Sequence, residues 1–179
     1  MGKFDEAIGL FRKALEVDPL SADNYYNLAL TLDHAGRPDE AVAALKRVLA
    51  LEPAYASAHL MIARVYLGQS RAEEAMAEAR QEKDFIWHLV GMPLVYHAMG
   101  QKKEADAALT ELIAKLGADA AFQIAEVYGY RGESDLAFQW LERAYSQRDG
   151  GLTEIKGDPL LKGIEKDPRY APFLRKIRL

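Results

Sequence analysis

Cysteine is absent from this chain, and the other groups that carry catalysis are few. None of its 179 residues is cysteine and only four are histidine. Without cysteine there is no disulfide framework, thiol catalysis or thiolate zinc site. The histidines form neither an H-E-x-x-H motif nor a pair four residues apart, and the glycine motifs of nucleophile elbows and phosphate-binding loops are missing. The sequence therefore predicts no enzyme, no metal site and no cofactor.

Long hydrophobic runs are also missing. The longest stretch without a charged residue covers residues 85–101, and it contains two histidines, a proline and two glycines. Because a membrane-spanning helix needs roughly 20 predominantly apolar residues, this stretch is interpreted as a buried helix. The N-terminus has acidic residues and no apolar run, so no signal peptide is expected. We expect a cytoplasmic protein that has no membrane partner.

The charge is weak and unevenly distributed. The formal net charge is -4, with the acidic excess in residues 1–142 and a basic excess after them. Many of the acidic residues fall in turns that open helices or join them, and the last basic residues suit the C-terminal end of a helix. These positions have structural explanations, and we expect no nucleic-acid partner.

The chain contains a repeat with a period near 34 residues. GKFDEA at 2–7 recurs as GRPDEA at 36–41 and SRAEEA at 70–75, and with shorter spacing as GQKKEA at 100–105 and GESDLA at 132–137. In the second copy Gly36 is expected to end one helix, and Pro38 to open the next. Apolar residues follow helical spacing on both sides of this turn. They are Tyr25, Leu28, Ala29 and Leu32 before it and Ala41, Leu45 and Val48 after it.

These residues resemble the tetratricopeptide repeat, whose period is 34 residues. The resemblance implies an all-α fold, an α-α superhelix of about 4.5 helix-turn-helix repeats with a short helical C-terminal cap. Stacked hairpins of this kind share a continuous core. The expected boundaries are a half repeat at 1–19, full repeats at 20–53, 54–84, 85–117 and 118–148, and capping helices at 149–179.

Two parts of the chain depart from the pattern of the family. Glu82 and Trp87 stand where alanine and proline are expected, and Pro93 occupies a small-residue position, so the helix from residue 85 is expected to bend or to begin late. The first copy starts at its inter-helix glycine, so it lacks a first helix. The missing helix favours the interpretation that the chain is a piece of a longer protein. Alternatively, the face around Phe4, Ile8 and Phe11 packs on a partner or pairs two chains.

The tail after residue 148 loses the period. Asp158-Pro159 and Asp167-Pro168 each suit a helix start, and they predict short helices at about 159–165 and 168–177 that cover the last hairpin. Residues 137–177 resemble the C-terminal end of bacterial multidomain regulators that carry these repeats. In that set the effector is a class III adenylate cyclase, a winged-helix domain or a protein kinase, and adenylate cyclase is our first hypothesis.

The family's concave groove implies the candidate binding residues. They are Tyr26, Asn27, Leu30 and Asp33; Leu60, Met61 and Arg64; Trp87, Val90, Leu94 and His97; and Phe122, Gln123, Glu126 and Tyr130. The Lys and Asn clamp of the family's chaperone-tail binders is absent, because Tyr26, Leu30, Leu60 and Arg64 occupy those positions. For Trp87 and Leu94, a place in the core is an equally good interpretation.

The sequence thus predicts a protein–protein interaction module. The expected partner is a protein, a peptide or another domain of the same polypeptide, bound in the groove of a regulatory or scaffolding fragment. The alternative is a structural element that forms a homodimer through the N-terminal half-repeat.

Overall fold

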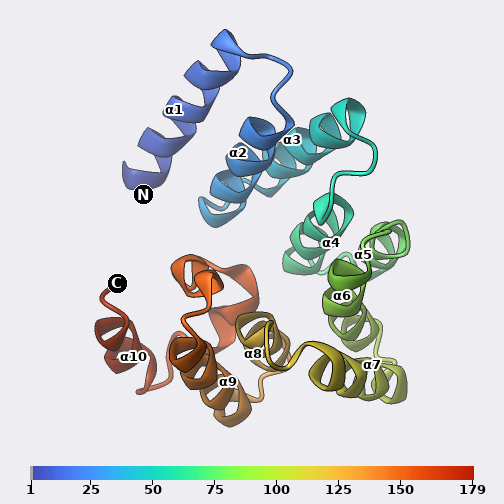
Figure 1. The fold of residues 1–179 in the computed structure, drawn as a ribbon, viewed down its shortest axis with the longest axis vertical. Coiled ribbons are helices and arrows are strands. Elements are labelled where there is room, and N and C mark those ends of the chain that lie inside the picture. The colour runs from blue at the N-terminus through green and yellow to red at the C-terminus, as the bar shows by residue number, and fades with distance from the viewer. Residues whose placement is uncertain (1) are drawn as a thin grey trace. The chain divides into compact units, whose positions relative to one another are not determined.

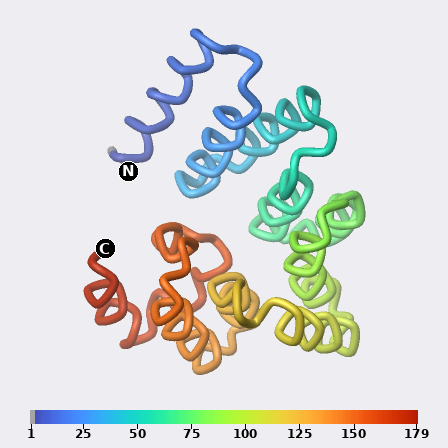
Figure 2. Tube along the Cα trace, in the orientation of Figure 1, coloured from blue at the N-terminus to red at the C-terminus, as the bar shows by residue number. Residues whose placement is uncertain are grey.

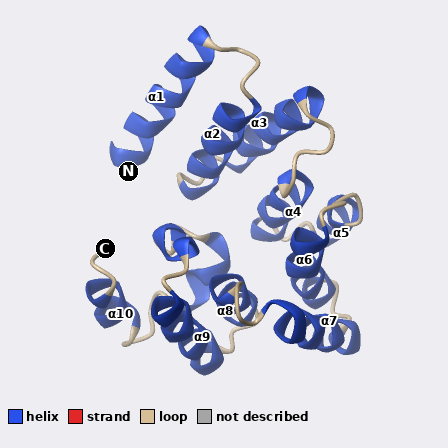
Figure 3. Cartoon of the chain, viewed as in Figure 1, coloured by secondary structure: helices blue, strands red, loops and turns tan. Residues whose placement is uncertain are grey.

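The computed structural model describes residues 2–179, and over these residues the chain is helical with no strand (Figure 3). It divides into two compact units, Met1–Gly91 and Met92–Leu179. The division falls inside one helix, α6 (Phe85–Ala98). None of the described helices is long and apolar enough to cross a membrane. The predicted all-α, helix-turn-helix fold class is confirmed.

The first unit contains α1 (Gly2–Val17), α2 (Ala22–His34), α3 (Pro38–Leu51), α4 (Ala58–Gly68), α5 (Ala72–Ala79) and the start of α6 (Figure 1). The pairs α2–α3 and α4–α5 form hairpins, and α1 packs on α2.

The turn between α2 and α3 has the predicted chemistry. Gly36 has a φ of 73°, which glycine adopts without strain, and Pro38 is the first residue of α3. Across the hairpin the small residues Ala29 and Ala41 are both buried, so the two helices meet through small side chains.

The second unit contains the rest of α6, α7 (Lys102–Leu116), α8 (Ala121–Tyr130) and α9 (Ser134–Gln147). Two 3-10 helices, η1 (Gly150–Glu154) and η2 (Pro159–Ile164), and α10 (Tyr170–Lys176) follow. After α9 the trace turns back and runs beside the hairpin of α8 and α9 (Figure 2). The short helix predicted at 159–165 corresponds to the 3-10 helix η2.

The tail and the last hairpin share one hydrophobic core. Ile155, Leu161 and Ile164 from the tail are fully buried with Phe122 and Leu141 of the hairpin. Two glycines allow this close approach. A Cβ on Gly129 would lie 2.7 Å from Leu161 Cδ2, and one on Gly151 would lie 2.5 Å from Phe122 Cδ1.

Helix α6 begins at Phe85 and continues through Pro93. The expectation that this helix begins late is wrong. A proline inside a helix costs about 3 kcal/mol, but α6 buries Leu89, Val90, Leu94 and Val95. Burial of such side chains contributes about 1.5–3 kcal/mol each, which offsets that cost.

Candidate partner-binding surface

An aromatic pair lies beside the start of α2 in the first unit. The rings of Tyr26 and Tyr55 lie 5.2 Å apart and are tilted by 33°. The hydroxyls of Tyr26 and Ser57 lie 2.8 Å apart, and the Tyr55 hydroxyl donates to Asp23 Oδ1 at 2.7 Å. Both tyrosines are half-buried. The pair therefore offers aromatic surface to solvent while hydrogen bonds fix its orientation.

The loop between α3 and α4 positions this pair. Ser57 is buried and has a φ of 70°, an uncommon conformation for a residue other than glycine, and it makes no side-chain cap to α4. Its hydroxyl faces Tyr26 instead. Burial and then the hydrogen bond to Asp23 raise the pKa of Tyr55 above its ordinary value. A tyrosine is protonated at neutral pH even without this shift, so the Tyr55 phenol is a donor there.

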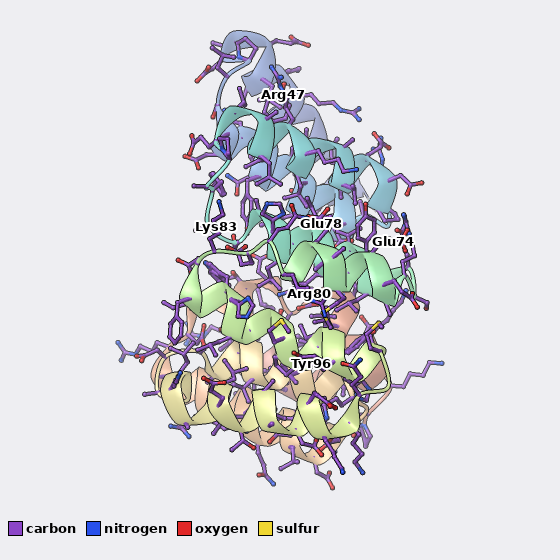
Figure 4. All side chains as sticks on the ribbon, turned by 90° about the vertical axis from the view of Figure 1, so that its right-hand side faces the viewer. Arg47, Glu74, Glu78, Arg80, Lys83 and Tyr96 are labelled. Atoms are coloured by element: carbon purple, nitrogen blue, oxygen red, sulfur yellow. The ribbon has the colours of Figure 1, made fainter. Side chains whose placement is uncertain are left out.

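A buried carboxylate fixes the N-terminal turn of α4. Glu82 accepts hydrogen bonds from the backbone N–H of Leu60, at 3.3 Å, and from that of Asp84, at 3.0 Å. On the same helix His59 Nδ1 lies 2.7 Å from an oxygen of Glu78, which projects from α5 (Figure 4). The sequence marked Glu82 only as a departure from the repeat. Its role as an acceptor for the α4 backbone follows from contacts that no spacing rule reveals.

Nine of the candidate groove residues keep exposed surface. They are Tyr26, Asn27, Leu30, Asp33, Arg64, Trp87, His97, Gln123 and Tyr130. The first six belong to the first unit, on α2, α4 and the start of α6, and the others belong to the second unit. These residues stay candidates for partner contact.

The remaining candidates are buried in this structure. They are Leu60, Met61, Val90, Leu94, Phe122 and Glu126. For Leu60 the reason is the close approach of α6, because a Cβ on Gly91 would lie 2.8 Å from Leu60 Cδ1. For Phe122 the reason is the tail, since Gly151 lies against its ring. Leu94 is buried and Trp87 is half-buried, so these two residues differ in exposure.

The second unit has a polar pocket at the turns after α6 and α8. It is lined by His97, Gly100, Lys102, Asp106, Arg131 and Glu133. Arg131 Nη2 donates to Asp106 at 2.6 Å, and its Nε donates to Glu133 at 2.6 Å. Burial, and then the nearby Arg131 charge, lower the pKa of His97, whose ring lies edge-on to Tyr130 at 5.8 Å.

Arg131 and Lys102 contribute two positive charges to this pocket and Asp106 and Glu133 two negative ones, so the pocket has no excess of one sign. In the described part of the chain no group of three or more His, Asp or Glu side chains could hold a metal ion.

Comparison with known proteins connects this geometry to a family. Residues 1–51 and residues 34–81 match two family models, both described as tetratricopeptide repeat. No curated protein matches the chain. Neither matching family model is catalytic. These repeats in general form surfaces on which other proteins bind.

Solved structures extend the same fold beyond residue 81. A thermophilic tetratricopeptide-repeat protein of Thermus thermophilus is 23% identical, with a TM-score of 0.64, covering 97% of this chain and 92% of its own. PilF of Pseudomonas aeruginosa is 20% identical, with a TM-score of 0.59, covering 99% and 84%. YrrB, described as having an unusual peptide-binding site, is 21% identical, with a TM-score of 0.52, covering 94% and 98%. The tetratricopeptide-repeat models thus match residues 1–81, and these solved structures show that the same helical fold continues over the rest of the chain.

Proposed function

We propose that the chain is an interaction module that binds a peptide or a folded domain of another protein on the exposed side of α2 and α4. The observation that carries this proposal is the half-exposed pair of Tyr26 and Tyr55, held by hydrogen bonds to Ser57 and Asp23. Aromatic residues of fixed orientation supply contact area at little cost in conformational entropy, and they are enriched among binding hot spots.

The chemistry around this pair favours a partner with both apolar and polar groups. Leu30 adds half-exposed aliphatic surface on α2, while Asn27 and Asp33 on the same helix carry amide and carboxylate groups. Trp87, at the start of α6, is a further half-exposed aromatic residue of the first unit. An extended peptide that carries an apolar side chain and free backbone N–H groups would suit these residues.

The cellular context that we propose is the cytoplasm, where the chain would serve as a regulatory or scaffolding part of a bacterial signalling protein. The support for this context is the resemblance of residues 137–177 to the C-terminal end of such regulators. An adenylate cyclase is the first candidate effector, and a domain of the same polypeptide would then be the partner.

Selection of a random peptide library on the whole chain tests the binding surface. The affinity of selected peptides would be measured by calorimetry for the wild type, for Tyr26→Ala and for the control Tyr145→Ala. Tyr145 is an exposed tyrosine of α9 in the other unit. We expect at least about tenfold weaker binding for Tyr26→Ala, as for a hot-spot residue, and no change for the control. Equal affinities for all three proteins would show that this surface is not the site.

A second role, the pairing of two chains through α1, has its own observation. On α1, Leu10 is 62% exposed and Val17 88%, and Leu20 in the turn after the helix is 67% exposed. Exposed apolar residues that gather in one region can mark an interaction surface. The sequence placed this face around Phe4, Ile8 and Phe11, but Ile8 is buried against the rest of the unit and the two phenylalanines are half-buried. Helical spacing places the exposed Leu10 and Val17 on another side of α1.

A further inference from the structure

The sequence of α1 consists of two successive seven-residue segments with matching apolar positions. KFDEAIG at 3–9 is followed by LFRKALE at 10–16, and Val17 begins a third segment. Phenylalanine, alanine and an aliphatic residue recur seven residues apart. Such a repeat places equivalent side chains in one row along a helix, which is the pattern of helices that pair side by side.

Only part of this apolar surface is used within the first unit. Ile8 is buried and Leu15 half-buried, and α1 packs on α2. The row of Ala7, Leu10, Ala14 and Val17 lies on another side, with the alanines half-exposed and the larger residues strongly exposed. Its spacing of three and four residues is that of a contact seam between two helices.

The charges beside this seam are reversed between the two segments. Glu6 in the first segment corresponds to Lys13 in the second, and both side chains are exposed. Two copies of α1 that run antiparallel place the first segment of each copy against the second segment of the other. Glu6 of each copy then faces Lys13 of the second copy on one edge of the seam. A parallel pair would instead place Glu6 beside Phe11.

We infer that α1 is the contact surface for a second copy of this chain, in an antiparallel pair centred between Ile8 and Gly9. This inference rests on the pairing role proposed above. In this register Leu10 of one copy packs on Ala7 of the other, so a large side chain meets a small one. Ala14 then lies opposite Lys3 of the second copy, and Val17 lies beyond the end of the contact. Phe4 faces Phe11 of the second copy on the edge opposite the Glu6–Lys13 contacts. The arrangement is symmetric under a two-fold rotation, as a closed dimer requires.

The small size of the seam predicts a weak pair. Two short heptads bury less than the roughly 800 Å² per partner that a standard stable interface uses. We therefore expect a dissociation constant in the micromolar to millimolar range, and faster dissociation at high salt because the edge charges are exposed.

Sedimentation equilibrium of the whole chain between about 1 μM and about 1 mM covers the range expected for a weak pair. Glu6→Lys and Lys13→Glu should each weaken self-association at least about tenfold, because each places like charges opposite one another. An equimolar mixture of these two variants should pair as strongly as the wild type, since every contact is then between opposite charges. Lys46→Glu, an exposed change on α3, should leave pairing unchanged.

The mixture also distinguishes lost pairing from lost folding, because a variant with an unfolded α1 would not be rescued by the other. A wild type that stays monomeric throughout would overturn both this geometry and the pairing role. A wild type that pairs while both charge variants pair equally well would overturn the register alone. Recovery of pairing in the mixture is the result that supports it.

Discussion

The first helix and the last hairpin of this chain are built from the same repeat, yet their apolar faces meet very different surroundings. On α1, Leu10 and Val17 remain exposed. On α8 and α9, an apolar surface that includes Phe122 and Leu141 is covered by the tail, whose Ile155 and Leu161 are fully buried. An apolar side chain stabilises a fold only if something covers it. The difference therefore predicts that side chains at the tail act on stability, whereas those on α1 act on association.

Truncation of one leucine in each region gives the largest expected effect. Leu161→Ala removes a fully buried side chain beside Gly129 and should lower the free energy of unfolding by about 2–5 kcal/mol. Leu10→Ala on α1 should change it by less than about 0.5 kcal/mol. Urea unfolding at submicromolar concentration would measure both without interference from pairing. Equal losses would show that the tail is not part of the core.

Two neighbouring glycines test how tightly the tail packs. Gly151→Ala places a Cβ against the Phe122 ring and should destabilise the protein by about 1–3 kcal/mol. Gly150→Ala meets nothing within 4 Å. It should be neutral or stabilising by up to about 1 kcal/mol, because it restricts the unfolded chain. Thermal unfolding of the two variants would reveal the difference. Similar melting temperatures would contradict the close contact with Phe122.

In the first unit, a glycine at a turn residue with a positive φ should raise the free energy of unfolding, by less than the losses expected at the tail. Ser70 replaces the glycine of the repeat and has a φ of 59°, so Ser70→Gly should stabilise the protein by about 1 kcal/mol. Ser57 also has a positive φ, but its hydroxyl lies 2.8 Å from that of Tyr26. Ser57→Gly should therefore gain less, because it loses this hydrogen bond. A larger gain for Ser57→Gly in chemical denaturation would argue against the role of Ser57 in holding Tyr26.

The smallest effect concerns pH and belongs to the tail. Hydrogen bonds from the Arg169 guanidinium, and then from its backbone N–H, lower the pKa of Asp167 to about 2. The folded value lies below the unfolded one of 3.8, so this stabilisation is present above pH 3.8 and is lost as the pH falls through about 2. As the pH falls from 3.8 to about 2, the free energy of unfolding should decrease less for the Asp167→Asn variant than for the wild type. Urea unfolding at several pH values would measure this difference. Parallel curves for the two proteins would contradict the linkage.

Much of the helical framework could be predicted from the residues alone. The recurrent glycine turns, with Gly36 and Pro38 as the clearest example, place helix ends where the structure has them. Local rules succeed here because the left-handed conformation of glycine and the missing N–H of proline act within one turn of the chain. The late start predicted from Pro93 does not occur, because α6 begins at Phe85 and buries Leu89, Val90, Leu94 and Val95.

The candidate binding surface was less predictable. Family positions indicated Tyr26 and Arg64, which are partly exposed, but also Phe122 and Leu60, which are buried. Whether such a residue is open depends on which distant segment passes over it. The tail reaches Phe122 from nearly thirty residues away in the chain, and α6 reaches Leu60 from a similar separation. Sequence spacing along one helix holds no information about these contacts.

The repeat, the helix boundaries near its glycines and prolines, and the reversed charges of the two heptads in α1 can all be read from the residues in order. Each of them depends on the chemistry of neighbouring residues or on helical periodicity. Three other features could be seen only in the folded chain. The tail covers α8, Glu82 accepts a hydrogen bond from the backbone at the start of α4, and Leu10 and Val17 are exposed. Burial is a property of packed neighbours, so it emerges only when segments far apart in the chain come together.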